Sequence, residues 1–142
     1  LFILCLALAS PAMSQFVPDP ALRMVDLPPR TSEPITVQVD FYLLDVTAVN
    51  GSEESFNAAL YFNFSWKDPR MAFDAAAFGA DRVLFAGDKS QDQLQDMWSP
   101  EIYAANLVGD GTVNEPLLTI FSDGRVTYEA RVTGTFKTPM QL

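Results

Sequence analysis

The chain has 142 residues, of which 49% are hydrophobic and 19% charged, and its formal net charge at pH 7 is −9. This length and apolar content predict a single globular domain with one core. The nine basic residues are scattered, so no nucleic-acid partner is expected, because phosphate binding requires clustered Lys and Arg. Histidine, the usual general base and metal ligand, is absent. We therefore expect no catalytic residue, metal or cofactor.

The first 14 residues are typical of a secretory signal peptide. The apolar run 1–9 is too short to span a membrane, and Ala12 and Ser14 are small residues suited to a cleavage site before Gln15. Cys5, the only cysteine, lies in this segment, so the mature domain is expected to contain no disulfide. A buried N-terminal strand is the alternative for this segment.

Alternation of apolar and polar residues predicts the first strands. Residues 15–34 contain five prolines and predict an extended lead-in, because proline excludes a continuous helix or a central strand. Alternation over 35–43 predicts one strand, and the polar segment 50–54 predicts a turn. Apolar residues at every second position of 56–66 predict another strand, which places Tyr61 on its polar face.

Periodicity weakens after residue 68. Segments 72–80 and 91–97 have helical composition over one or two turns, and 82–86 is compatible with a short strand. Aspartates at every fourth position of 88–96 disfavour a long helix, and no EF-hand pattern is present, so a solvated acidic loop is expected rather than a calcium loop.

The C-terminal part predicts a hairpin. Residues 117–121 lead into the turn 122–124, and apolar and polar residues alternate from Val126 to Phe136. Strands at this spacing, with turn signals and little helix, predict an all-β sandwich. Trp66 ends a strand on its apolar face and is expected in the core, whereas Trp98 is compatible with the core or with carbohydrate stacking.

Three motifs resemble one family. Trp66-Lys67-Asp68-Pro69-Arg70, Trp98-Ser99-Pro100-Glu101 and the hairpin from Phe121 to Tyr128 occur in the order found in the ligand-binding domain of pentameric ligand-gated ion channels, the Cys-loop receptor superfamily, in its bacterial branch. The resemblance spans residues 34–142 and implies the immunoglobulin-like β-sandwich of that domain, truncated at its C-terminal side. It also implies structural roles for Trp66, Asp68, Trp98 and Pro100.

The resemblance implies a ligand site between subunits. One subunit would contribute the segment 103–106, and Ala105 replaces an aromatic residue there, which disfavours an aromatic box. The polar turn 50–54 would couple binding to the gate. The implied ligand-binding residues are Tyr103, Ala105 and Asn106 of one subunit with Tyr61, Thr127, Glu129 and Arg131 of the next, and the coupling residues are Asn50, Gly51, Ser52, Glu53 and Glu54.

The resemblance further implies a homopentamer in the cell (inner) membrane, with residues 35–142 forming a periplasmic or extracellular domain and the four membrane helices missing from this fragment. An amine, a proton or a divalent cation is the expected small ligand. The alternative is a stand-alone exported binding module, either a soluble pentamer or a carbohydrate-binding sandwich. A secreted hydrolase is a third reading, but this stretch without histidine offers no catalytic group for it.

Overall fold

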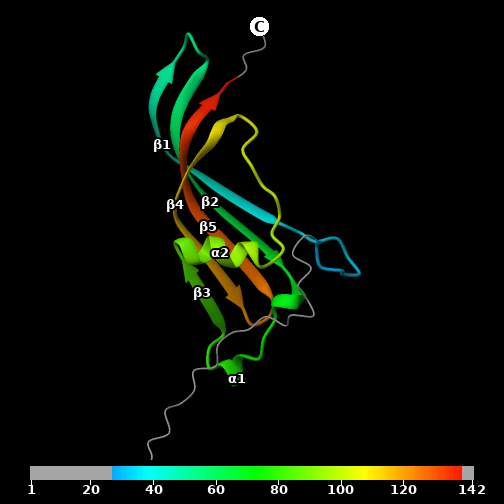
Figure 1. The fold of residues 1–142 in the computed structure, drawn as a ribbon. Helices are drawn as coiled ribbons and strands as arrows, with labels where there is room; N and C mark the ends of the chain where they lie inside the picture. Colours follow the sequence, from blue (N-terminus) through cyan, green and yellow to red (C-terminus); the bar gives the residue numbers. More distant parts are fainter. Residues whose placement is uncertain (1–26, 139–142) are drawn as a thin grey trace, which may run out of the picture.

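The structure, a computed structural model, describes residues 27–138 as one long antiparallel sheet with short helices (Figure 1). The five strands lie in the order β1-β2-β5-β4-β3. The expected signal peptide and most of the proline-rich lead-in lie outside the described residues. The elements are β1 (Gln38–Asn50), β2 (Ser55–Lys67), η2 (Pro69–Met71), α1 (Ala75–Phe78), β3 (Arg82–Ala86), α2 (Asp88–Gln95), β4 (Leu107–Phe121) and β5 (Arg125–Lys137).

The predicted all-β class is confirmed. The strand predicted at 56–66 lies within β2, the short strand at 82–86 is β3, and the predicted turn at 122–124 joins β4 to β5. Only one short helical turn, α1, forms within the segment 72–80, where Asp74 caps it by accepting hydrogen bonds from the backbone N–H groups of Ala76 and Ala77.

The boundaries of two strands differ from the prediction. The first strand begins at Gln38 rather than Ile35 and continues to Asn50, because register shifts after Leu43 and Val46 break the alternation that the sequence pattern follows. The strand before the final turn begins at Leu107 rather than Leu117. Register shifts within β4, together with glycines at positive φ, interrupt the alternation in its N-terminal half, so the sequence pattern does not predict that half.

The prediction of an acidic loop at 88–96 is wrong, because most of this segment is the helix α2. This helix overlaps the segment 91–97, which has helical composition. Ser90 is fully buried and donates its hydroxyl to the Gly87 carbonyl at 2.7 Å, and Leu94 packs against the core. Repulsion between aspartates four residues apart costs only about 0.2–0.5 kcal/mol per pair. Burial on one side of the helix outweighs that cost, while the aspartates remain exposed.

The strand register divides the sheet into two faces, since directly paired residues lie on the same face. We call them the apolar face and the polar face. The apolar face includes Phe41, Phe56, Phe62, Phe64, Trp66, Val126, Tyr128, Ala130, Val132 and Phe136, and the polar face includes Tyr42, Asn57, Tyr61, Asn63, Ser65, Lys67, Arg125, Thr127, Glu129 and Arg131.

The core covers only one half of the apolar face. There α2 lies across the sheet (Figure 1), and the buried cluster consists of Trp66, Met71, Met97, Leu118, Ile120 and Val126. The other half is only partly covered: Ala58 and Phe136 are buried there, whereas Phe41 on β1 is 66% exposed, and a pocket of about 400 Å³ lies between the sheet and the segment 102–107. All the strands within residues 27–138 belong to a single sheet, so this half of the apolar face has no second sheet among the described residues.

The three sequence motifs meet at one end of the sheet. The Trp98 ring packs edge-on against Trp66, with centroids 6.5 Å apart, which places Trp98 against the core. The Asp68 backbone N–H donates to the Gly124 carbonyl at 2.9 Å. Gly124 has φ +83°, and a Cβ on it would lie 2.7 Å from the Asp68 carbonyl oxygen, so only glycine fits this turn.

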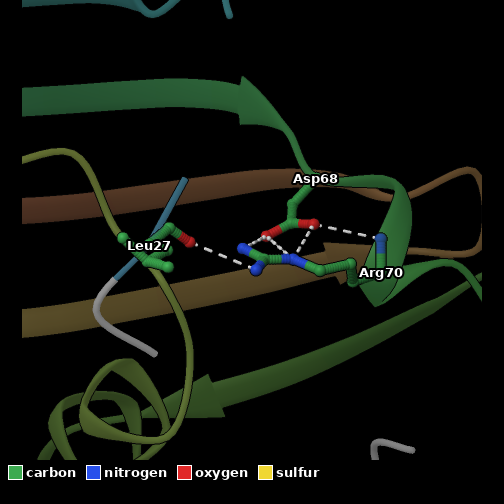
Figure 2. A network of polar contacts seen from close by, with 3 residues as sticks. All are labelled: Leu27, Asp68 and Arg70. Carbon is green, nitrogen blue, oxygen red and sulfur yellow. Dashed lines mark hydrogen bonds and ion pairs between the residues drawn. The ribbon is translucent and has the colours of Figure 1, made fainter. Parts of the chain in front are cut away.

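Asp68 organises the chain that leaves β2. Its carboxylate is 1% exposed and accepts hydrogen bonds from the Arg70 backbone N–H and guanidinium, including Nη2 at 2.7 Å. Figure 2 shows that Arg70 also donates to the Leu27 carbonyl at 3.2 Å. The carboxylate raises the pKa of Arg70 by hydrogen bonding to it. The pair therefore fixes η2 and ties Leu27, at the start of the described residues, to the end of β2.

Candidate functional site

The middle of the polar face brings together four of the predicted ligand-binding residues. Tyr61 lies on β2 directly opposite Arg131 on β5, and Glu129 and Thr127 follow on the same face of β5. The two strands place these side chains together because each strand alternates with period two. Sequence pattern and register agree on this group.

Tyr61 and Glu129 form the group's strongest contact. The Tyr61 hydroxyl donates a short hydrogen bond to Glu129 Oε2. This hydrogen bond, followed by burial, raises the pKa of Tyr61 to about 12. Tyr61 was expected to be exposed on the face opposite Trp66; it does lie on that face, but it is half-buried. The hydrogen bond leaves the second carboxylate oxygen of Glu129 without a partner among the residues described here.

Two further residues belong to this group and were not predicted. Tyr42 pairs with Tyr61 across β1 and β2, and their ring centroids are 6.4 Å apart. Asn63 lies directly opposite Glu129 on β5, two positions after Tyr61 on the same face of β2, and its buried Oδ1 has no hydrogen-bond partner among the described residues. The polar alternation of β1 contains Tyr42 and could have identified it. The unsatisfied amide oxygen is a property of packing and leaves no signal in the sequence.

The group combines donors and acceptors for a small polar molecule. The Glu129 carboxylate is an acceptor beside two tyrosine rings, an arrangement that suits an ammonium group. Arg131 is exposed and forms no ion pair with any residue from 27 to 138, so its guanidinium is available to a carboxylate.

The segment 103–106 lies elsewhere in the same chain. Tyr103, which is 83% exposed, and Ala104 line the open pocket on the apolar face, together with Phe62 and Tyr128. Ala105 is exposed, and the Asn106 amide donates to the Lys137 carbonyl at 3.2 Å. The two predicted halves of the ligand site are therefore separated by the sheet within one chain.

The predicted coupling segment is a defined turn between β1 and β2. Asn50 Oδ1 accepts hydrogen bonds from the Ser52 backbone N–H at 3.2 Å and from its hydroxyl at 2.8 Å. Glu54 has φ +51°, and its carbonyl accepts from the Thr138 N–H at 2.9 Å. The turn lies at the end of the sheet remote from α1 (Figure 1), so it is also remote from the motif cluster.

Two negative observations apply to residues 27–138. No three His, Cys, Asp or Glu side chains are grouped so that they could hold a metal ion. The helices of this part of the chain are all too short or too polar to cross a bilayer.

Comparison with known proteins identifies the class. Residues 23–142 match the model of the neurotransmitter-gated ion-channel ligand binding domain, and the chain belongs to this family.

Individual relatives are distant. The chain is 26% identical over 115 residues to a proton-gated ion channel of Gloeobacter violaceus, covering 81% of the chain and 30% of the relative. It is 28% identical over 127 residues to the gamma-aminobutyric acid receptor subunit rho-2 of Bos taurus, covering 83% and 26%. It is 24% identical over 115 residues to the gamma-aminobutyric acid receptor subunit pi of Rattus norvegicus, covering 78% of the chain and 24% of the relative. The chain thus spans less than a third of these relatives.

Proposed function

We propose that the chain is part of the periplasmic or extracellular ligand-binding domain of a pentameric ligand-gated ion channel subunit in the cell membrane. Family membership and the group of polar side chains around Tyr61 support this proposal. The full-length protein would be a homopentamer in which binding of a small ligand opens a transmembrane pore. Residues 1–14 would direct export and be removed after Ser14.

The ligand site would lie across a subunit boundary. Tyr61 with Glu129 and the segment 103–106 occupy opposite faces of the sheet, so a single chain cannot bring them together. In a ring, the polar face of one subunit meets a different surface of the next, because each contact in a closed ring joins two unlike surfaces. Tyr103 is 83% exposed and would gain a partner in that contact.

The ligand would carry a positively charged amine, alone or with a carboxylate. Glu129 offers an acceptor to the amine, and the exposed Arg131 offers donors to a carboxylate two positions along β5. Thr127 would add a hydroxyl on the same face. The turn 50–54 would transmit binding to the membrane part.

The open half of the apolar face would be covered by a second sheet of the sandwich in the full-length protein. Phe41 and Leu43 are 66% and 58% exposed there. Contiguous apolar surface of this kind marks an interaction site in a soluble domain.

The test is a dose–response measurement on the full-length protein in an oocyte or planar bilayer, with γ-aminobutyric acid and a pH jump as the first probes. These probes are chosen because the relatives include a proton-gated ion channel and a gamma-aminobutyric acid receptor subunit. Tyr61→Ala and Arg131→Ala should raise the half-maximal concentration about tenfold, as expected for the loss of one charge-assisted contact. Lys137→Ala, on the same face of β5 but at its far end, is the control. An unchanged response in both variants, at normal surface expression, would remove the site from this face.

A further inference from the structure

A row of cations crosses the polar face at the end of the sheet near α1. Lys67 on β2 is directly opposite Arg125 on β5, and Arg82 on β3 is directly opposite Phe121 on β4. Phe121 and Arg125 flank the turn 122–124. Three of the nine basic residues of a chain with net charge −9 therefore lie in one row of neighbouring strands.

Phe121 orients two of the three cations, Arg125 and Arg82. The Arg125 guanidinium carbon lies 3.6 Å from the centre of the Phe121 ring, and that of Arg82 lies 5.7 Å from it. Stacking fixes the plane of a guanidinium but leaves the N–H groups at its edge available. Arg125 is thus oriented without its side-chain donors being used.

The negative charges near the row do not neutralise it. Asp81 pairs with Arg82 at 3.1 Å, but both side chains are more than half exposed, and such pairs contribute little. Asp123 accepts the backbone N–H of Arg125 at 3.0 Å. Within residues 27–138, Lys67 and Arg125 form no ion pair. Like charges directly opposite each other across two strands are destabilising, so an anion bound between Lys67 and Arg125 would stabilise the pair.

A pocket adjoins the row. Its volume is about 210 Å³, and it is lined by Lys67 and Arg125 together with the uncharged side chains of Thr36, Gln38 and Ser65 and the carboxylate of Asp123. Trp66 completes the lining. Two cations and three neutral hydrogen-bonding groups outnumber the single Asp123 carboxylate there, which suits a planar or tetrahedral oxyanion.

We propose that Lys67 and Arg125 form a binding site for an oxyanion, either a carboxylate or a phosphate group, with Arg82 adding positive charge beside it. This site is distinct from the Tyr61–Glu129 group, because Arg125 precedes Glu129 by four residues, or about 13 Å, along β5. It does not depend on the channel assignment. The oxyanion comes either from a free small molecule or from an acidic side chain of a neighbouring copy of the chain.

The experiment compares thermal unfolding of the purified full-length protein in sodium phosphate, sodium succinate and sodium chloride at matched pH and ionic strength. A free oxyanion that binds the row should raise the Tm of the wild type above its value in chloride. Arg125→Gln should abolish this rise, and isothermal titration with succinate or phosphate should show at least about a tenfold loss of affinity. Lys137→Gln, the matched control on the same face of β5, should retain both effects.

An acidic side chain of a neighbouring copy, the second possible source of the oxyanion, would give different thermal unfolding results. If a carboxylate of a neighbouring copy occupies the row, added oxyanions leave the wild type unchanged, and Arg125→Gln lowers the temperature at which the oligomer dissociates relative to Lys137→Gln. Lys67→Gln, which removes a charge but no ring contact, replaces Arg125→Gln if that variant fails to fold. The proposal is overturned if Arg125→Gln, or Lys67→Gln in its place, behaves like Lys137→Gln and the wild type in two respects: the change of Tm on adding oxyanions and the temperature at which the oligomer dissociates.

Discussion

Tyr61 shows how one hydroxyl links two strands. It donates to Glu129 from the neighbouring strand, stacks at an angle beside Tyr42, and lies next to the unsatisfied amide oxygen of Asn63. The resulting surface is preorganised, because the tyrosine and the carboxylate already hold each other in place. Gly124, which directly precedes β5, allows the backbone of its turn to approach the backbone of Asp68 closely.

Gly124→Ala should destabilise the domain by about 2 kcal/mol or more, because φ +83° is unfavourable for an L-residue and the new Cβ would contact the Asp68 carbonyl. Gly51→Ala is the control, since a Cβ at that turn position meets no atom within 4 Å. Chemical denaturation of the two variants gives the comparison. Equal unfolding free energies would show that the turn does not constrain Gly124.

Alkaline titration tests the hydrogen bond of Tyr61. The folded protein raises the pKa of Tyr61 from 10.0 to about 12, so the bond's contribution to stability is complete below pH 10 and is lost as the pH rises through about 12. Burial also raises the pKa of Tyr128. Tyrosinate absorbance should therefore show two late-titrating tyrosines, and Tyr61→Phe should remove one. A wild type whose tyrosines all ionise near pH 10 would contradict this hydrogen bond.

At the scale of elements, β2 and β5 carry both the core and the candidate site, one on each face. Trp66 is 3% exposed on the apolar face, whereas Tyr61 lies on the polar face five positions earlier. An odd spacing in a regular strand sends two side chains to opposite faces. The same strand therefore carries a core residue on one face and a residue of the candidate site on the other.

Trp66→Ala should destabilise the domain by about 3–5 kcal/mol, as truncation of a core aromatic residue does. Tyr61→Ala should cost only about 1–2 kcal/mol, mainly through the lost hydrogen bond. Urea denaturation of both variants checks the difference. Similar losses would place both side chains in one environment and would contradict the observed register.

The sequence predicts these two strands well because their apolar residues alternate without interruption from Phe56 to Trp66 and from Val126 to Phe136. It fails where tertiary packing decides the outcome. Burial of Ser90 and Leu94 makes α2 a helix despite its aspartates, and register shifts extend β1 beyond its simple pattern. Alternation places Tyr61, Glu129 and Arg131 of the candidate site on one face, as the register does. The unsatisfied oxygen of Asn63 depends on neighbours that no local pattern identifies.

At the scale of the whole molecule, the two ends of the sheet differ in role. The motif cluster and the buried core lie at one end, and the open apolar surface and the turn 50–54 lie towards the other (Figure 1). The proposed full-length protein would use the rigid end to support its fold and the remaining surfaces for contacts with further strands, neighbouring subunits and the membrane part.

Phe41→Ser tests whether a second sheet covers the apolar face. If Phe41 stayed 66% exposed in the full-length protein, its substitution would lower the free energy of unfolding by about 0.5 kcal/mol at most. Under a second sheet in the full-length protein, the same substitution should cost more than about 2 kcal/mol. Val108→Ser, on the polar face at 47% exposure, is the control. A near-neutral Phe41→Ser in the full-length protein would argue against the covering sheet.

A subunit-mixing experiment tests whether the ligand binds between chains. Full-length subunits carrying Tyr103→Ala are co-expressed with subunits carrying Tyr61→Ala, and agonist dose–response curves are recorded for each variant alone and for the mixture. A site between chains predicts a component with wild-type sensitivity only in the mixture, because some boundaries then join an intact Tyr103 to an intact Tyr61. A mixture that shows only the reduced sensitivity of the separate variants, although both subunits assemble together, would contradict the account, because a site within one chain always carries one of the two substitutions.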